Sequence, residues 1–186
     1  MGIDVFGVFQ QRKEGRWSYL SRYYDGRRGT LRAWLGVDSY RGARRTEIPL
    51  ILPLRGLPTD LDLNEPVGTK STIENVIGEW GHSWLMGTEI INSTLPVVNL
   101  KIWIPLDTYN TWDKSSNPEI WNELDPEWQQ DEDVHYFATP DHINENTYRV
   151  IVEYPYDFSK DVEYFIDEVR QLIALHGEVR FVYGFA

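Results

Sequence analysis

Residues able to do chemistry are concentrated between positions 80 and 85. The segment Trp80-Gly81-His82-Ser83-Trp84-Leu85 brings an imidazole, a hydroxyl and two indoles together. Arg55 adds a guanidinium upstream, inside the proline-bounded segment 53–58. An imidazole can move protons, an indole can stack on a flat ring, and a guanidinium can bind a phosphate or a carboxylate. The combination predicts a binding pocket or an active site.

A catalytic interpretation also needs Asp4. If the groups converge, Asp4 would orient His82 while Arg55 holds an anion, as acid–base or phosphate chemistry requires. The alternative is structural: Arg55 pairs with a carboxylate to fix its loop, and His82 and Ser83 satisfy backbone groups after a helix end. We favour the structural alternative, because active-site groups are rare beside structural polar residues. No residue is therefore assigned as catalytic.

Binding without catalysis lies between these interpretations. Trp80 and Trp84 could stack a base while Arg55 takes its phosphate, although indoles are more often part of a core. The predicted ligand-binding set is Asp4, Arg55, Trp80, His82, Ser83 and Trp84. No cofactor and no metal is predicted.

The segment 107–146 is acidic, interrupted by prolines and rich in tryptophan, and we predict that it is an insertion or flap. Its carboxylates and imidazoles match no defined metal-site spacing, so a solvated acidic loop is favoured. Those residues are Asp131, Glu132, Asp133, His135, Asp141 and His142. The alternative is a mimic of nucleic acid, with Trp121 and Trp128 as apolar anchors. Upstream, Gly26-Arg27-Arg28-Gly29 lacks the pattern of a nucleotide-binding loop and predicts a turn.

Composition limits the class of protein. The chain has 186 residues, of which 41% are hydrophobic and 14% aromatic, which suits one folded domain. It contains no cysteine, so disulfides, thiolate nucleophiles and cysteine-bound zinc are excluded. No apolar run reaches membrane-spanning length and no secretion signal is present, so a cytoplasmic location without membrane association is expected.

Charge is distributed unevenly along the chain. Residues 1–55 hold eleven Lys and Arg against five Asp and Glu, whereas the remaining residues hold seven against twenty-four. The basic part could meet phosphates or an acidic partner, but the acidic remainder argues against direct nucleic-acid binding. The alternative is that the two parts neutralise each other within the fold or across the interface of a homo-oligomer.

Periodicity in the first half predicts a hairpin and short helices. Alternation over residues 3–9 and a turn at 14–15 predict a β-hairpin that continues through Leu20. A short helix is predicted over 31–35, capped by Thr30 and stopped by Gly36. Ser71 and Glu74 have capping-box spacing, and residues 73, 76, 77 and 80 then predict a helix ending at Gly81. Residues 82–85 would follow it in an irregular or extended stretch.

The second half gives the fold class. Residues 98–104 alternate as a half-buried strand, and proline after Asn117 and after Asp125 predicts two short helices. Residues 148–154, a helix from Ser159 to Gly177 and residues 179–185 form a strand–helix–strand unit whose crossover would most simply join parallel strands. We predict a single α+β domain, with a mixed or antiparallel sheet, helices on one face and a C-terminal β-α-β unit.

Several short sequence blocks are distributed along nearly the whole chain, and their order is informative. They are Met1-Gly2-Ile3-Asp4, Pro53-Leu54-Arg55-Gly56-Leu57-Pro58, the 80–85 segment, and His176-Gly177 followed by the aromatic strand 179–185. The chain thus resembles small, functionally uncharacterised bacteriophage and prophage proteins that begin Met-Gly-Cys-Asp-Ile-His. Ile3 and Phe6 stand where that pattern has Cys and His, and the segment around His82 is shortened. A metal or catalytic role at those positions is therefore not carried over.

The resemblance implies a phage accessory protein and supplies no reaction. We expect a non-enzymatic protein of the host cytoplasm that counteracts host defence, by sequestering a nucleotide-like signal or by blocking a host defence protein. Two alternatives stay open. One is a small hydrolase or transferase acting on a phosphorylated substrate through His82 and Asp4, and the other is the acidic mimic of nucleic acid.

Overall fold

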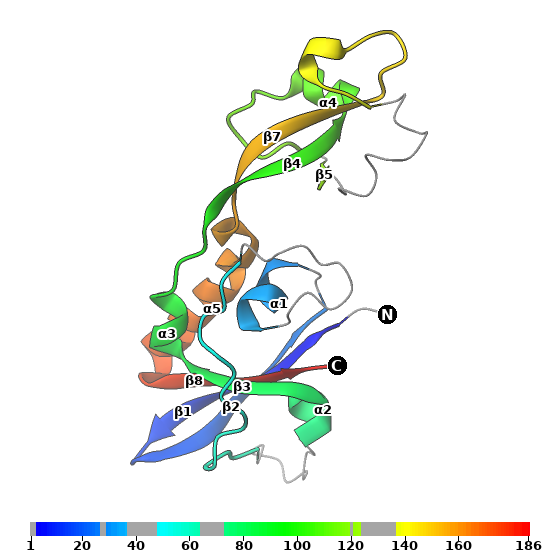
Figure 1. The fold of residues 1–186 in the computed structure, drawn as a ribbon. Helices are drawn as coiled ribbons and strands as arrows, with labels where there is room; N and C mark the ends of the chain where they lie inside the picture. The colour runs from blue at the N-terminus through cyan, green and yellow to red at the C-terminus, as the bar shows by residue number, and fades with distance from the viewer. Residues whose placement is uncertain (1–2, 27–28, 37–47, 64–72, 120, 124–136) are drawn as a thin grey trace. The chain divides into compact units, whose positions relative to one another are not determined.

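A computed structural model describes residues 3–26, 29–36, 48–63, 73–119, 121–123 and 137–186. The chain divides into two compact units, the first made of Met1–Pro96 with Phe158–Ala186 and the second of Val97–Asp157. The second unit contains the predicted acidic insertion 107–146 together with the strands that flank it. Figure 1 shows the elements of both units in chain order. The fold class is α+β, as predicted.

The first unit is built on a four-stranded antiparallel sheet. Its strands are β1 (Val5–Lys13), β2 (Arg16–Asp25), β3 (Trp80–Met86) and β8 (Val179–Phe185), in the order β2-β1-β8-β3. The predicted hairpin is confirmed and extends to Asp25. Because β8 lies between β1 and β3, its residues are buried on both sides, which explains the nearly continuous apolar sequence of this strand.

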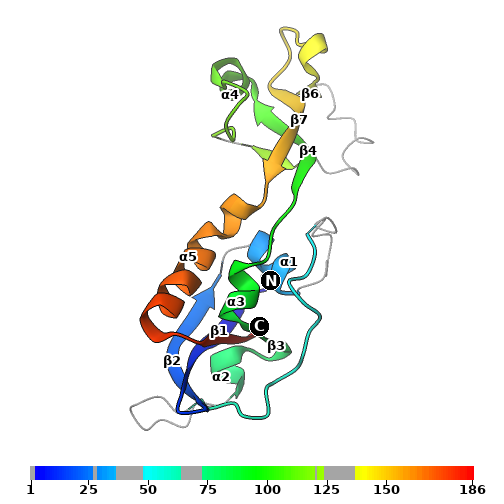
Figure 2. The same cartoon turned by 90° about the vertical axis from the view of Figure 1, so that its left-hand side faces the viewer.

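One face of this sheet packs against the helix α5 (Ser159–His176), which runs along it in Figures 1 and 2. Phe165 of α5 contacts Phe9 and Phe181, with ring centroids 6.2 and 5.3 Å apart, and Val169 is fully buried. The short helix α1 (Thr30–Leu35) ends where Gly36 adopts a φ of 116°, as predicted. Its N-cap is Gly29, however, because Thr30 instead donates its hydroxyl hydrogen bond to Asp161.

The opposite face carries the helix α2 (Ile73–Ile77) and the segment 57–63, which we call the strap. Val76 and Ile77 pack on Val8 and Val182 of the sheet, with leucines of the strap against the same cluster. Residues 48–63 connect the two faces: Ile51 N–H donates to the Trp34 carbonyl of α1 at 3.1 Å, whereas the strap lies over the α2 side. This path takes the segment around the outer strand β3.

The second unit is a mixed four-stranded sheet. Its long strands β4 (Val97–Pro105) and β7 (Arg149–Asp157) pair antiparallel, β5 (Asn122–Glu123) joins β4, and β6 (Phe137–Ala138) runs parallel to β7. The helix α4 (Leu106–Thr111) and the 3-10 helix η3 (Pro140–His142) complete it. Leu100, Ile102 and Ile104 are buried, so the alternation predicted over 98–104 is confirmed.

The helix predicted to end at Gly81 is shorter than expected. It stops at Ile77, because Gly78 adopts a φ of 80°, and Trp80 already belongs to β3. Residues 82–85 are extended, as one of the two expectations had it, and Ser71 lies outside the described residues. The helix α3 (Gly87–Ile91) follows directly, with Glu89 accepting a hydrogen bond from the Met86 amide at 2.8 Å.

Two further expectations need correction. The described residues 118, 119 and 121–123 are not helical, contrary to the helix predicted after Asn117, and the Asn117 side chain accepts a hydrogen bond from Tyr154 at 2.8 Å. The helix predicted after Asp125 lies outside the described residues. The C-terminal order β7-α5-β8 is confirmed, but β7 and β8 belong to different sheets, so the crossover does not join neighbouring parallel strands. Strand periodicity shows which faces are buried but does not show which sheet a strand enters.

Candidate functional site

The 80–85 segment forms the outer strand β3, and a bulge divides it. Trp80 pairs with Phe185 and Ser83 pairs with Tyr183, so Gly81 and His82 together oppose Gly184. Trp80 packs on Phe185 with ring centroids 5.3 Å apart and is 43% exposed. The bulge separates Trp80 from the part of the strand that carries Ser83 and Trp84.

His82 and Asp4 have separate structural partners. The Nε2 atom of His82 lies 2.9 Å from the carbonyl oxygen of Gly78, to which a protonated Nε2 donates. Asp4 accepts a hydrogen bond from the Tyr24 hydroxyl at 2.9 Å, and its backbone pairs with Ala186. The imidazole therefore satisfies a carbonyl just after a helix end, as the structural alternative predicted for His82.

Arg55 is fixed by three contacts at the edge of β3. Its guanidinium donates to both carboxylate oxygens of Glu89, at 2.9 and 2.7 Å, and lies over the Trp84 ring with Cζ 4.5 Å from the centroid. Its backbone N–H donates to Ser83 Oγ at 2.9 Å. The structural alternative expected this pairing with a carboxylate, but the sequence did not identify the carboxylate as Glu89. Ser83 Oγ is the acceptor in this bond, and Ser83 is buried.

The Arg55–Glu89 pair makes stability depend on pH. Burial alone would raise the pKa of Glu89, but the Arg55 guanidinium and the Met86 amide together hold it below its ordinary value of 4.5. A depressed pKa in the folded state contributes stability above the unfolded pKa, and that contribution is lost as the pH falls through the folded pKa.

We therefore expect Glu89→Gln to lower the free energy of unfolding at pH 7 by on the order of 1 kcal/mol. The difference from the unsubstituted protein should shrink below about pH 4.5, where the unfolded carboxyl becomes protonated. Urea titrations across pH 3 to 7 measure this. Asp167→Asn is the matched control, because its pair with Arg170 is more than half exposed. A difference that grows at low pH would contradict the expectation.

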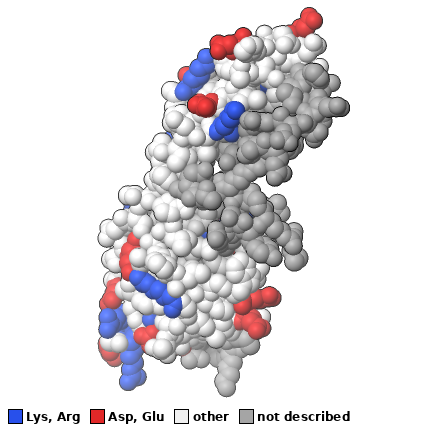
Figure 3. Space-filling model, in the orientation of Figure 1, with Lys and Arg blue, Asp and Glu red and all other residues white. Residues whose placement is uncertain are grey.

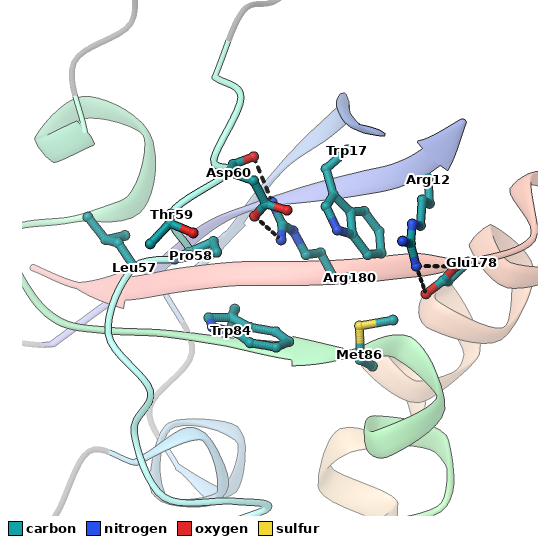
Figure 4. A pocket seen from close by; sticks show the side chains of 10 residues that line it. All are labelled: Arg12, Trp17, Leu57, Pro58, Thr59, Asp60, Trp84, Met86, Glu178 and Arg180. Carbon is teal, nitrogen blue, oxygen red and sulfur yellow. Dashed lines mark hydrogen bonds and ion pairs between the residues drawn. The ribbon is translucent and has the colours of Figure 1, made fainter. Parts of the chain in front are cut away.

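An open pocket of about 500 Å³ lies on the strap side of the first unit's sheet (Figure 4). Its lining comprises Arg12, Trp17, Leu57, Pro58, Thr59, Asp60, Trp84, Met86, Glu178 and Arg180. The indoles of Trp17 and Trp84 flank β8, from which the side chain of Arg180 reaches Asp60 of the strap. Of the predicted ligand-binding set, only Trp84 lines this pocket.

Arg180 is the structural centre of the pocket. Its side chain is 3% exposed, yet it donates to Gln10 Oε1 at 2.8 Å, to Asp60 Oδ1 at 2.6 Å and to the Asp60 carbonyl at 3.1 Å. Its guanidinium also lies 4.5 Å from the centroid of the Trp17 ring. Burial lowers the pKa of Arg180 and the pair with Asp60 opposes this, but a guanidinium stays charged at any physiological pH.

Arg12 is placed differently at the other end of the pocket. Its guanidinium lies 3.3 Å from Glu178, and both side chains are 46% exposed. It also lies over Trp17, with Cζ 5.9 Å from the ring centroid. An exposed pair of this kind contributes little stability, so Arg12 can exchange its carboxylate for another anion at small cost.

Sequence reasoning missed Trp17, Arg12 and Arg180 as site residues. Arg12 and Trp17 pair across the first hairpin, so its register places them side by side on one face. Arg180 is the one charged residue within the apolar sequence of β8, and a charge within a buried strand must find partners. Both signals are in the sequence, but joining them requires knowing that β8 lies between β1 and β3.

A second pocket, of about 420 Å³, includes Gly26 of the predicted turn. Asp25 and Glu168 line it together with three tyrosines, and Asp25 accepts hydrogen bonds from Tyr23, at 3.3 Å, and from Tyr164. Burial raises the pKa of Glu168. Carboxylates on this lining do not favour a phosphate, and Arg27 and Arg28 lie outside the described residues.

Most of the candidate metal residues lie outside the described part of the chain, namely Asp131, Glu132, Asp133 and His135, and so does Trp128. Asp141 and His142 belong to η3, where His142 Nδ1 lies 2.8 Å from the Thr139 hydroxyl. Trp121 packs against Tyr156 with ring centroids 4.9 Å apart. Among the residues that are described, no group of three or more His, Cys, Asp and Glu side chains could hold a metal ion.

Basic and acidic side chains lie close together in the first unit. The pairs Arg12–Glu178, Arg55–Glu89 and Arg180–Asp60 each join a basic residue to an acidic one far away in the sequence. Figure 3 likewise shows basic side chains beside acidic ones on the visible face of this unit. Two of these pairs, Arg12–Glu178 and Arg55–Glu89, join the basic residues 1–55 to the acidic remainder, which is the neutralisation within the fold that was one of the two expectations for the charge. No helix in the described ranges is long and apolar enough to cross a membrane.

No known protein family, curated protein or solved structure matches this chain. The resemblance to phage and prophage proteins therefore stays a prediction, and the site is interpreted from its own geometry.

Proposed function

We propose that this chain is a non-enzymatic binding protein whose pocket beside the strap takes a nucleotide-like ligand. The observation that carries the proposal is the presence of two indoles, Trp17 and Trp84, and two guanidiniums, Arg12 and Arg180, in one pocket of about 500 Å³. Indoles bind the flat ring of a base by stacking, and guanidiniums bind its phosphate with paired hydrogen bonds. The volume is within the range typical of small-molecule sites.

The two guanidiniums have different roles in this proposal. Arg180 is buried and already holds Asp60 and Gln10, so it fixes the strap against the sheet. Arg12 is half exposed, and its 3.3 Å contact with Glu178 is easily exchanged. A phosphate that reaches Arg12 can form two charge-assisted hydrogen bonds, which are stronger than the contact that it replaces.

The geometry gives less support to an enzyme. His82 and Asp4, the residues on which the hydrolase alternative depends, bind Gly78 and Tyr24 and do not line the pocket. The two carboxylates that do line it, Asp60 and Glu178, are paired with arginines. Such pairing suits carboxylates that fix the site or bind a ligand, and the lining residues described here include no histidine, the side chain that most often serves as a general base.

The context of the binding rests on the resemblance to phage proteins. In that context, the protein acts in the host cytoplasm and removes a nucleotide signal on which a host defence system depends. A host defence protein as the bound partner, and a homo-oligomer as the assembled form, belong to the same proposal as alternatives. The mimic of nucleic acid depends on residues 107–146, of which 120 and 124–136 lie outside the described residues.

A nucleotide panel tests the proposal. The protein is incubated with mononucleotides, cyclic mononucleotides and cyclic dinucleotides, and the bound fraction is then released by heat denaturation and analysed. Recovery of an unchanged ligand supports the proposal. Recovery of a converted ligand would show an enzyme, and the absence of any retained nucleotide would overturn nucleotide binding.

Substitution of the two tryptophans of β3 localises the site. We expect Trp84→Leu to weaken binding about tenfold or more, because the loss of one base–indole stack costs about 1–3 kcal/mol. Trp80→Leu is the matched control, since Trp80 is an indole of the same strand outside the pocket, and should change the dissociation constant less than twofold. Calorimetric titration measures both. Equal losses in the two variants would contradict the assignment of the pocket.

A further inference from the structure

Asp60 is held rigidly at the rim of the pocket. Its Oδ1 accepts the Arg180 hydrogen bond at 2.6 Å, and its carbonyl accepts a second bond from the same guanidinium at 3.1 Å. Arg180 is itself fixed by Gln10, whose amide also donates to the Asp62 carbonyl of the strap at 2.6 Å. These contacts restrict the positions that the carboxylate can take.

The second carboxylate oxygen of Asp60 is available to a ligand. The Asp60 side chain is 59% exposed, although its partner Arg180 is buried. Within the described part of the chain, Oδ2 of Asp60 accepts no hydrogen bond. Asp60 lines the pocket together with both indoles, and Figure 4 shows its carboxylate on the same side of β8 as Trp17. A flat ring stacked on an indole would thus present its edge to a fixed acceptor.

We propose that Asp60 selects guanine as the base of the ligand, an inference that rests on the proposed nucleotide binding. An ionised carboxylate only accepts hydrogen bonds. Guanine presents two adjacent donors, N1–H and the N2 amino group, on one edge. Adenine presents its N6 amino group beside N1, which is an acceptor and would repel the carboxylate. Asp60 therefore stabilises bound guanine and destabilises adenine bound at the same position.

The size of the preference follows from the same chemistry. A site built to hydrogen-bond a ligand donor rejects an analogue that lacks it, because the site's own polar group is then left without a partner. Since Asp60 is at the exposed rim, water still reaches it when adenine is bound. We therefore expect guanine to be bound about tenfold to a hundredfold more tightly than adenine, a smaller preference than a fully buried carboxylate would give.

Three purine monophosphates test the inference on the unsubstituted protein. Guanosine 5′-monophosphate should bind at least tenfold more tightly than adenosine 5′-monophosphate by calorimetric titration. Inosine 5′-monophosphate keeps N1–H and lacks the N2 amino group, so its affinity should lie between them. If adenosine 5′-monophosphate binds as tightly as guanosine 5′-monophosphate, the choice of base is overturned while the proposed function stays in place. If none of the three monophosphates binds and no nucleotide of the panel is retained, both the choice of base and the proposed function are overturned.

Asp60→Asn then tests the residue itself. Asparagine keeps a carbonyl oxygen for Arg180 but replaces the second oxygen with an amino group, which donates and cannot accept. The guanosine-to-adenosine preference should fall to within about twofold. Asp62→Asn, the same change at a carboxylate of the strap that does not line the pocket, is the control and should keep the preference. Thermal unfolding establishes that both variants are folded, and an Asp60→Asn protein that retains the full preference would overturn the role of Asp60.

Discussion

Gly184→Ala is expected to destabilise the protein by about 3 kcal/mol or more, because a methyl group at this position has no space. Gly184 lies in β8 opposite the bulge of Gly81 and His82. A Cβ atom there would collide with the Ile77 carbonyl oxygen and lie 2.6 Å from Cδ2 of His82. The first collision is with backbone at the end of α2, which cannot move without displacing that helix.

The same substitution should release His82 from its structural contact. The ring of His82 lies against Gly184 while its Nε2 contacts the Gly78 carbonyl, so displacement of the ring breaks this hydrogen bond. Urea denaturation gives the loss of stability, and NMR of the imidazole reports the change in its environment. The fit of His82 onto β8 thus gives the histidine of this strand a structural role.

Gly56→Ala is the comparison that isolates the collision. Gly56 has a φ of 73° and no atom within 4 Å of an added Cβ, so its substitution costs only the backbone strain, about 1 kcal/mol. Gly184→Ala should therefore cost clearly more than Gly56→Ala. Similar losses would mean that β8 and α2 move apart easily at this point.

The elements that the sequence predicts well are those whose signal is local. Alternation located the first hairpin, β4, β7 and β8, apolar spacing at helical period located α5, and Gly36 and Gly177 mark helix ends as expected. The end of α2 was misplaced because the apolar spacing continues to Trp80, although Gly78 already stops the helix with a positive φ. Apolar spacing is the same for the buried face of a helix and for residues that cross from a helix into a strand.

The site was predicted only in part, because its contacts join distant positions. The structural pairing of Arg55 was expected, but its partner Glu89 is 34 residues away and no pattern connects the two. Trp84 was selected because it stands beside other chemical groups, and it does line the pocket, whereas Trp80 does not. Apart from Met86, which is also in β3, the other lining residues come from β1, β2, the strap, and β8 with the preceding Glu178, and the strand order β2-β1-β8-β3 brings them together.

Arg180→Met should show how much the pocket depends on one buried guanidinium. Methionine fills similar volume but leaves Gln10 Oε1, whose side chain is fully buried, without its donor and frees Asp60 from the sheet. Removing one member of a buried charged cluster costs about 3–5 kcal/mol when the partner charge stays buried. Since Asp60 is 59% exposed and can turn to water, we expect about 2–4 kcal/mol.

The loss should be concentrated at the strap. Arg180 holds the strap through the carboxylate and carbonyl of Asp60, so hydrogen exchange in residues 57–63 should accelerate more than in α5. Nucleotide binding should weaken with it, because the strap supplies Leu57, Pro58, Thr59 and Asp60 to the lining.

Arg12→Met is the control that separates burial from charge. It removes an arginine from the same pocket, but its pair with Glu178 is half exposed, so its unfolding free energy should change by no more than about 1 kcal/mol. The substitution should nevertheless weaken ligand binding clearly, because Arg12 is the residue proposed to bind the phosphate of the ligand. If Arg180→Met costs no more stability than Arg12→Met, the buried guanidinium does not hold the strap, and Asp60 would lose the rigidity on which the choice of guanine depends.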